Sequence, residues 1–245
     1  MRPATRTLVA CVVLSSVLGT IHAFSLFIGP FEDGLDAGRG AVSSVYSLAL
    51  VALTLAVLTG HPLFRRVPAP LIALGAAGGA AAGLVLAASA SSLTILIVGY
   101  GLVFGTSNGI GYAFSLQQGA EANPDRRGMA AGMAIMGFGG GAMIGTPMKE
   151  YFIRLFYRAP DFLGAIGDVE LVTQAGRRFA EVAGVLQEVV VAGAAEVRDM
   201  TIPGPEGVYL VNSGSSGVAE TFFIIGLIYL VVMLLAAFSY RLPAE

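Results

Sequence analysis

Long uncharged apolar stretches alternate with short charged turns along most of the chain. An α-helix needs about 20 apolar residues to cross a hydrocarbon core about 30 Å thick. The uncharged run from Val67 to Ala120 is too long for one helix, so we expect a hairpin that turns at Ser89–Ser92. The pattern predicts an all-α membrane protein with six spans, at about residues 7–31, 41–64, 70–88, 93–117, 128–148 and 221–240.

Glycine recurs at every fourth residue in three of these spans. Residues four apart lie one turn above each other on a helix, so each series forms a groove without side chains. Such a groove lets the backbone of a neighbouring helix approach closely, which predicts tight packing between several membrane helices. The predicted helix-packing glycines are Gly75, Gly79, Gly83, Gly101, Gly105, Gly109, Gly137, Gly141 and Gly145.

The composition supports a membrane protein and argues against several other classes. Charged residues make up 12% of the 245 residues, whereas soluble domains carry about 25%. The net charge of −2 and the lack of a basic cluster exclude an obvious nucleic-acid partner. Cys11 is the single cysteine, so an internal disulfide is excluded, and we expect neither a metal nor a cofactor.

The N-terminal apolar run has three interpretations. Arg2 and Arg6 precede an apolar stretch that ends near His22, which resembles a secretory signal. The uncharged run continues to Phe31, however, and this length favours a membrane span. The segment Leu8–Cys11 has the lettering of a lipoprotein site, but almost no apolar sequence precedes it.

The distribution of arginine predicts the orientation in the membrane. Six spans place both termini on one side, and the short loops of the opposite side contain Arg39 alone. Positively charged loops stay in the cytoplasm, so we expect an integral protein of the plasma (inner) membrane with both termini cytoplasmic. The arginines on the cytoplasmic side are Arg2, Arg6, Arg65, Arg66, Arg126, Arg127 and Arg241.

A polar segment separates the fifth and sixth spans. We expect residues 1–148 to form helices one to five, residues 149–218 an extracytoplasmic insert, and residues 219–245 the sixth helix and the start of a central cytoplasmic loop. Apolar residues at helical spacing over 171–186 predict an amphipathic helix, whereas 189–191 and 207–211 resemble strands. The insert is therefore predicted to be a small αβ unit, with a disordered linker as the alternative.

Two stretches of the chain resemble each other. Gly19–Leu26 and Gly109–Leu116 are identical at five of eight positions, and His22 aligns with Tyr112. The first stretch runs outward and the second inward, which is the arrangement of two inverted three-helix repeats. Such repeats commonly place a substrate site between them, near the middle of the bilayer.

Three motifs resemble the oxalate/formate antiporter family of the major facilitator superfamily. They are the hinge and its flank Asn123–Gly141, the stretch His22–Phe27 followed by Pro30, and Tyr100–Gly101 with Gly109–Tyr112. The resemblance implies half of a major facilitator fold. It also implies secondary transport, by alternating access, of a small organic anion such as oxalate, formate or another carboxylate.

The chain departs from the family pattern at several points. Phe64 occupies the acidic position of the loop between helices two and three, and Gly101 stands where many relatives carry arginine. The superfamily has twelve helices, so six spans imply a second six-helix half. That half is expected as a missing C-terminal part, a partner chain or a second copy of the chain, and the other expected partners are the anion and membrane lipid.

Four residues are predicted to bind the substrate. His22 is the one ionisable side chain well inside a predicted span, and such residues are functional candidates. Asn108 and Tyr112 lie one turn apart and can both face a cavity, with Phe24 beside His22. The alternative for His22, Asn108 and Tyr112 is a hydrogen bond to a neighbouring helix. The predicted spans contain no lysine or arginine, so the positive charge for an anion is expected from the second half.

The charged cytoplasmic turns have two interpretations. They either contact the second half in one state and so gate transport, or anchor the helices at the lipid headgroups. The predicted gating residues are Arg65, Arg66, Asp125, Arg126 and Arg127.

The alternative function is a self-contained six-helix channel or membrane assembly protein that works as a homo-oligomer. We do not expect an enzyme. Gly214–Gly217 has the lettering of an intramembrane serine protease, but the last span lacks the histidine that would serve as base.

Overall fold

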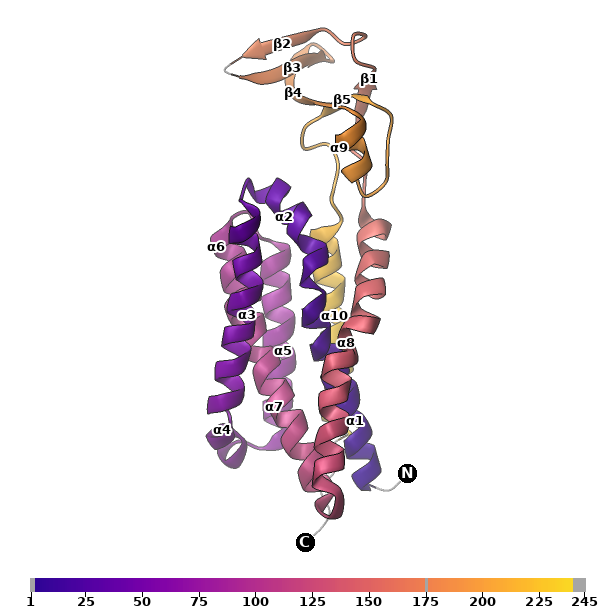
Figure 1. Cartoon of the computed structure of the whole chain (residues 1–245). Helices are drawn as coiled ribbons and strands as arrows, with labels where there is room; N and C mark the ends of the chain where they lie inside the picture. The colour runs from indigo at the N-terminus through magenta and orange to yellow at the C-terminus, as the bar shows by residue number, and fades with distance from the viewer. Residues whose placement is uncertain (1–2, 175, 240–245) are drawn as a thin grey trace. The chain divides into compact units, whose positions relative to one another are not determined.

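The computed structural model describes residues 3–174 and 176–239, which form two compact units (Figure 1). The helical unit comprises residues 1–150 and 219–245, and the β unit comprises residues 151–218. The predicted positions Arg2, Tyr240 and Arg241 lie outside the described residues.

Helices of the first unit lie side by side in Figure 1, and the first helix begins at the end of the bundle where the last helix ends. Three of the segments are not α-helical: η1 is a 3₁₀-helix within the first span, η2 is a π-helix within the fourth, and η3 is a short 3₁₀-helix directly before α8. In chain order, the helical elements are α1 (Pro3–Gly19), η1 (Thr20–Phe27), α2 (Ile28–Leu35), α3 (Arg39–Thr59), α4 (His61–Arg66), α5 (Ala69–Ala88), α6 (Leu93–Leu96), η2 (Ile97–Phe104), α7 (Gly105–Ala122), η3 (Pro124–Arg126), α8 (Arg127–Phe156) and α10 (Val218–Ala237).

Six helical segments are long and apolar enough to cross a membrane, counted within the described residues. This confirms the six predicted spans, while the side of the membrane on which each end lies stays a prediction. The segments are Pro3–Leu35, Arg39–Thr59, Ala69–Ala88, Leu93–Ala122, Pro124–Phe156 and Val218–Ala237.

The fifth helix is longer than the sequence predicted. We expected it to end at Met148, after Pro147 and before the charged Lys149, but α8 continues to Phe156 with Pro147 inside it. A single proline removes one helical hydrogen bond and need not end a helix that is held by its neighbours. Lys149 therefore lies within a membrane-length helix and not in a loop.

Eight of the nine predicted packing glycines face a neighbouring helix. At each of these eight positions, a Cβ atom added to the glycine would contact an atom of that helix. At Gly105, for example, that atom would lie 2.6 Å from the Ala49 carbonyl oxygen. The other contacts join Gly79 to Ser107, Gly83 to Phe104, Gly101 to Leu48, Gly109 to Leu53, Gly137 to Val12, Gly141 to Ser16 and Gly19, and Gly145 to Thr20.

Gly75 is the exception, and its predicted packing role is wrong. It is exposed on the surface of α5, and a Cβ atom added there would meet nothing within 4 Å. The four-residue spacing places Gly75 in line with Gly79 and Gly83, but no described helix covers α5 at the position of Gly75.

The β unit is a five-stranded antiparallel sheet in the order β1-β5-β4-β3-β2. Its core contains Ala180, Val189 and Val208, and the short helix α9 packs Val197 against Tyr209. The elements are β1 (Phe162–Gly164), β2 (Leu171–Gln174), β3 (Arg177–Val182), β4 (Val185–Ala192), α9 (Ala194–Asp199) and β5 (Gly207–Leu210).

The amphipathic helix predicted over residues 171–186 is wrong, because this segment forms strands β2 and β3 and the start of β4. A tight turn at Ala183 and Gly184, with φ of 52° and 80°, joins β3 to β4 and breaks any helical path. The strands predicted at 189–191 and 207–211 correspond to β4 and β5. The segment is thus a folded αβ unit and not a disordered linker.

The same substitution should have opposite effects at two glycines. Gly105→Ala places a methyl group against the Ala49 backbone and should destabilise the bundle by about 1–3 kcal/mol. Gly75→Ala meets open space and should stabilise it by about 0.5–1 kcal/mol, because alanine favours helix. Thermal unfolding in detergent measures both, and equal midpoints for the two variants would contradict the packing described here.

Candidate functional site

The first span is interrupted near its middle. Ala23, inside η1, has φ of −89° and ψ of 28°, which departs from helical geometry. An interrupted helix leaves carbonyl oxygens without their usual partners, and the hydrocarbon core supplies no water to replace them. Donors from neighbouring helices can therefore stabilise the carbonyl groups beside this break.

Three side chains from other helices supply these donors. The Asn108 amide donates to the Leu18 carbonyl at 2.9 Å, and the Tyr100 hydroxyl donates to the Ile21 carbonyl at 3.2 Å. Between them, the Lys149 ammonium donates to the Thr20 carbonyl at 2.6 Å. The Thr20 hydroxyl is also hydrogen-bonded to the Tyr229 hydroxyl of α10. Elements η2, α7, α8 and α10 thus all hold the interrupted segment.

Lys149 is the residue that the sequence reasoning missed. Its side chain is 3% exposed, and its ammonium lies 5.4 Å from the centre of the Phe27 ring. The expectation that the spans contain no lysine or arginine is therefore wrong, because α8 extends beyond the predicted boundary. The signal was available: Lys149 follows Gly141 and Gly145 at four-residue spacing, so it lies on the helix face that packs against α1.

Four side chains from four different spans meet on the surface of the helical unit. We call His22, Tyr46, Tyr112 and Phe138 the aromatic patch. His22 Nδ1 lies 2.9 Å from the Tyr46 hydroxyl, and its ring meets the Phe138 ring edge-on at 5.2 Å. The Tyr112 ring packs on the other side of the cluster, 4.2 Å from Phe138. His22 is exposed and the other three are partly exposed, so the patch presents an imidazole and two phenols on the surface of four membrane-length segments.

The structure brings three of the four predicted substrate-binding residues together. His22 and Tyr112 both contact Phe138, and the buried Phe24 stacks on Tyr46 with ring centres 5.9 Å apart. Asn108 does not join them, because it is fully buried with its amide on the Leu18 carbonyl. Its geometry matches the interhelical hydrogen bond that the sequence left as the alternative.

Tyr46 and Phe138 were not predicted as site residues. Tyr46 is the single tyrosine of its span, a signal that the sequence offered. Phe138 lies among glycines, and its role follows only from the close approach of α1 and α8.

The predicted gating residues are exposed and fall into two groups. Arg65 and Arg66 line a hollow of about 430 Å³ with His61 and Pro62. Asp125, Arg126 and Arg127 lie at the turn that opens α8. Among the described residues, the ion pairs are Arg39–Glu32 and Arg177–Glu188, so Asp125 does not pair with either neighbouring arginine.

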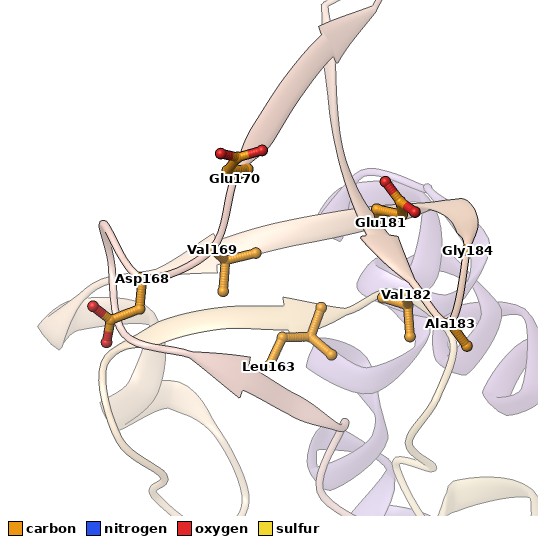
Figure 2. A pocket seen from close by; sticks show the side chains of 8 residues that line it. All are labelled: Leu163, Asp168, Val169, Glu170, Glu181, Val182, Ala183 and Gly184. Atoms are coloured by element: carbon orange, nitrogen blue, oxygen red, sulfur yellow. The ribbon is translucent and has the colours of Figure 1, made fainter.

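The β unit has a separate open hollow of about 650 Å³ (Figure 2). Leu163, Val169 and Val182 point into it, whereas the carboxylates of Asp168, Glu170 and Glu181 point outward from its rim in different directions. Within the part of the chain that the structure describes, no group of three or more His, Cys, Asp or Glu side chains is placed to hold a metal ion.

No model of a known protein family matches the chain. Two curated proteins are similar to it at 25% identity: the uncharacterized MFS-type transporter YhjX of Escherichia coli, over 137 residues, and monocarboxylate transporter 13 of Rattus norvegicus, over 139 residues. Both likenesses support membership of the major facilitator superfamily. Each alignment covers 56% of the chain but 34% and 32% of the respective relative, so the matched part of the chain spans about a third of either relative.

In a helical unit with an interrupted first span, the donors at the break should contribute strongly to stability. Asn108→Leu removes the donor to the Leu18 carbonyl and should cost about 1–3 kcal/mol, because the carbonyl is left buried without its partner. Thr54→Val is the control, since the Thr54 hydroxyl bonds to its own helix at an exposed position. Thermal unfolding in detergent compares the two, and equal losses would contradict the capping role of Asn108.

Proposed function

We propose that the chain forms the first six-helix half of a secondary transporter that moves a small organic anion, such as oxalate, formate or another carboxylate, by alternating access. The observation that carries this proposal is the aromatic patch. Similarity to transporters and six membrane-length helices support membrane transport in general.

The aromatic patch is unsuited to contact with lipid tails. Its imidazole and phenol groups need hydrogen-bond partners, and the hydrocarbon core offers none. A second helical half that covers the patch would enclose it as a pocket, with polar groups from three spans around an aromatic floor. Ligand pockets typically combine mostly apolar walls with a few converging polar groups.

The chemistry of the patch suits a carboxylate. The Tyr112 and Tyr46 hydroxyls and the His22 imidazole can donate hydrogen bonds to carboxylate oxygens. Similarity to a rat protein named as a monocarboxylate transporter agrees with this substrate class, as does the resemblance to oxalate/formate antiporters.

The second half would come from further sequence, a partner chain or a second copy. In the proposed orientation, both termini are cytoplasmic in the plasma (inner) membrane, and the β unit is extracytoplasmic. The exposed arginines Arg65, Arg66, Arg126 and Arg127, with Asp125, would contact the second half on the cytoplasmic side in one state of the cycle.

Removal of single hydroxyls from the patch tests this function. Tyr112→Phe and Tyr46→Phe keep the ring packing but remove donors, so each should raise the KM for carboxylate uptake several-fold while membrane insertion stays normal. Uptake of labelled formate and oxalate into proteoliposomes measures this. Ser44→Ala is the control, because the exposed Ser44 hydroxyl bonds to its own helix. Wild-type kinetics in both tyrosine variants would refute the role of the patch.

The same proteoliposomes separate a transporter from the alternative channel. A transporter should show saturable uptake that is accelerated when the same anion is loaded on the opposite side. Flux that rises linearly with concentration, without such acceleration, would favour a channel, and no flux of any carboxylate would refute the proposed function.

A further inference from the structure

Among the described residues, the buried ammonium of Lys149 has a hydrogen-bond partner but no counter-charge. Its described contacts are the Thr20 carbonyl and the face of Phe27. Within residues 3–174 and 176–239, the ion pairs Arg39–Glu32 and Arg177–Glu188 leave Lys149 without a carboxylate partner. An ammonium has three N–H donors, and one of them is accounted for by Thr20.

Capping alone does not explain a lysine at this position. The two neighbouring carbonyls, those of Leu18 and Ile21, are capped by the neutral side chains of Asn108 and Tyr100. A neutral donor is thus sufficient for this task in the same segment. A charge buried without an opposite charge is costly, and ionisable residues inside membranes usually mark a substrate or ion path.

Lys149 is connected to the aromatic patch through η1 and through α8. Its acceptor Thr20 is two residues from His22, and both belong to η1. Phe138 and Lys149 are eleven residues apart on α8, about three helical turns or roughly 16 Å, and they lie on the same face of that helix. A lysine side chain on a helix leans toward the helix N-terminus, which for Lys149 is the direction of Phe138.

We propose that Lys149 is the substrate-binding cation of this half: its ammonium rests on the Thr20 carbonyl in the empty state and pairs with the carboxylate of the transported anion at the aromatic patch. This inference rests on the proposed function. Release of the anion returns the ammonium to the Thr20 carbonyl. The anion supplies the counter-charge that Lys149 lacks among the described residues.

Charge and capping can be separated by substitution. Lys149→Gln retains an N–H donor for Thr20 but loses the charge, and it should raise the KM for formate and oxalate at least about tenfold in proteoliposomes. Tyr100→Phe is the matched control, because it removes a neutral donor from the adjacent Ile21 carbonyl and should leave that KM unchanged. Size-exclusion chromatography in detergent verifies that each variant is folded.

Chemical rescue gives a second, independent measurement. In a Cys11→Ser background, Lys149→Cys should lose uptake. Treatment with 2-aminoethyl methanethiosulfonate, which restores an ammonium, should recover it, whereas methyl methanethiosulfonate should not. Equal recovery with both reagents, or a wild-type KM for Lys149→Gln, would overturn the role of Lys149 and leave the proposed function intact. A wild-type protein that transports neither anion would refute the proposed function itself.

Discussion

The helical unit depends on satisfying carbonyl oxygens at a break in its first span. Backbone groups inside a bilayer have no water to bond with, so a break must be stabilised by side chains of other helices. Here η2, α7 and α8 each send one donor, to Ile21, Leu18 and Thr20 respectively. The break is therefore a tertiary feature: it exists because three distant segments of the chain converge on one turn of helix.

The glycine contacts allow the helices to approach one another closely enough for these donors to reach the break. Gly137 and Gly141 of α8 meet α1 at Val12 and Ser16, and Gly145 meets η1 at Thr20, so α8 and the first span run parallel in close contact. Lys149 is the next position in that series, and the close approach places its side chain against η1. The absence of side chains along the α8 groove thus brings a cation to a backbone carbonyl.

Sequence reasoning recovered the parts of the fold that follow from length and periodicity. The six spans follow from hydropathy, and eight glycine contacts match a simple four-residue spacing. The prediction was wrong where the same residues are compatible with two different structures. The charge of Lys149 predicts that the fifth span ends before it, at Met148, whereas in the structure Lys149 is buried and its ammonium donates to the Thr20 carbonyl. Residues 171–186 carry a helical apolar spacing, but the turn at Ala183 and Gly184 and pairing between strands decide their structure.

Each of the two similar stretches of sequence contributes one residue to the aromatic patch. His22 and Tyr112 occupy equivalent positions in Gly19–Leu26 and Gly109–Leu116, and both rings pack on Phe138. The stretches differ in backbone, however, since the first is a 3₁₀ segment with a break and the second lies in a continuous α-helix. In the first stretch, the carbonyls of Thr20 and Ile21 accept hydrogen bonds from Lys149 and Tyr100 of other helices. Two similar sequences can therefore have different structural roles in one site. Here the first forms the interrupted 3₁₀ segment, and the second forms part of an unbroken α-helix.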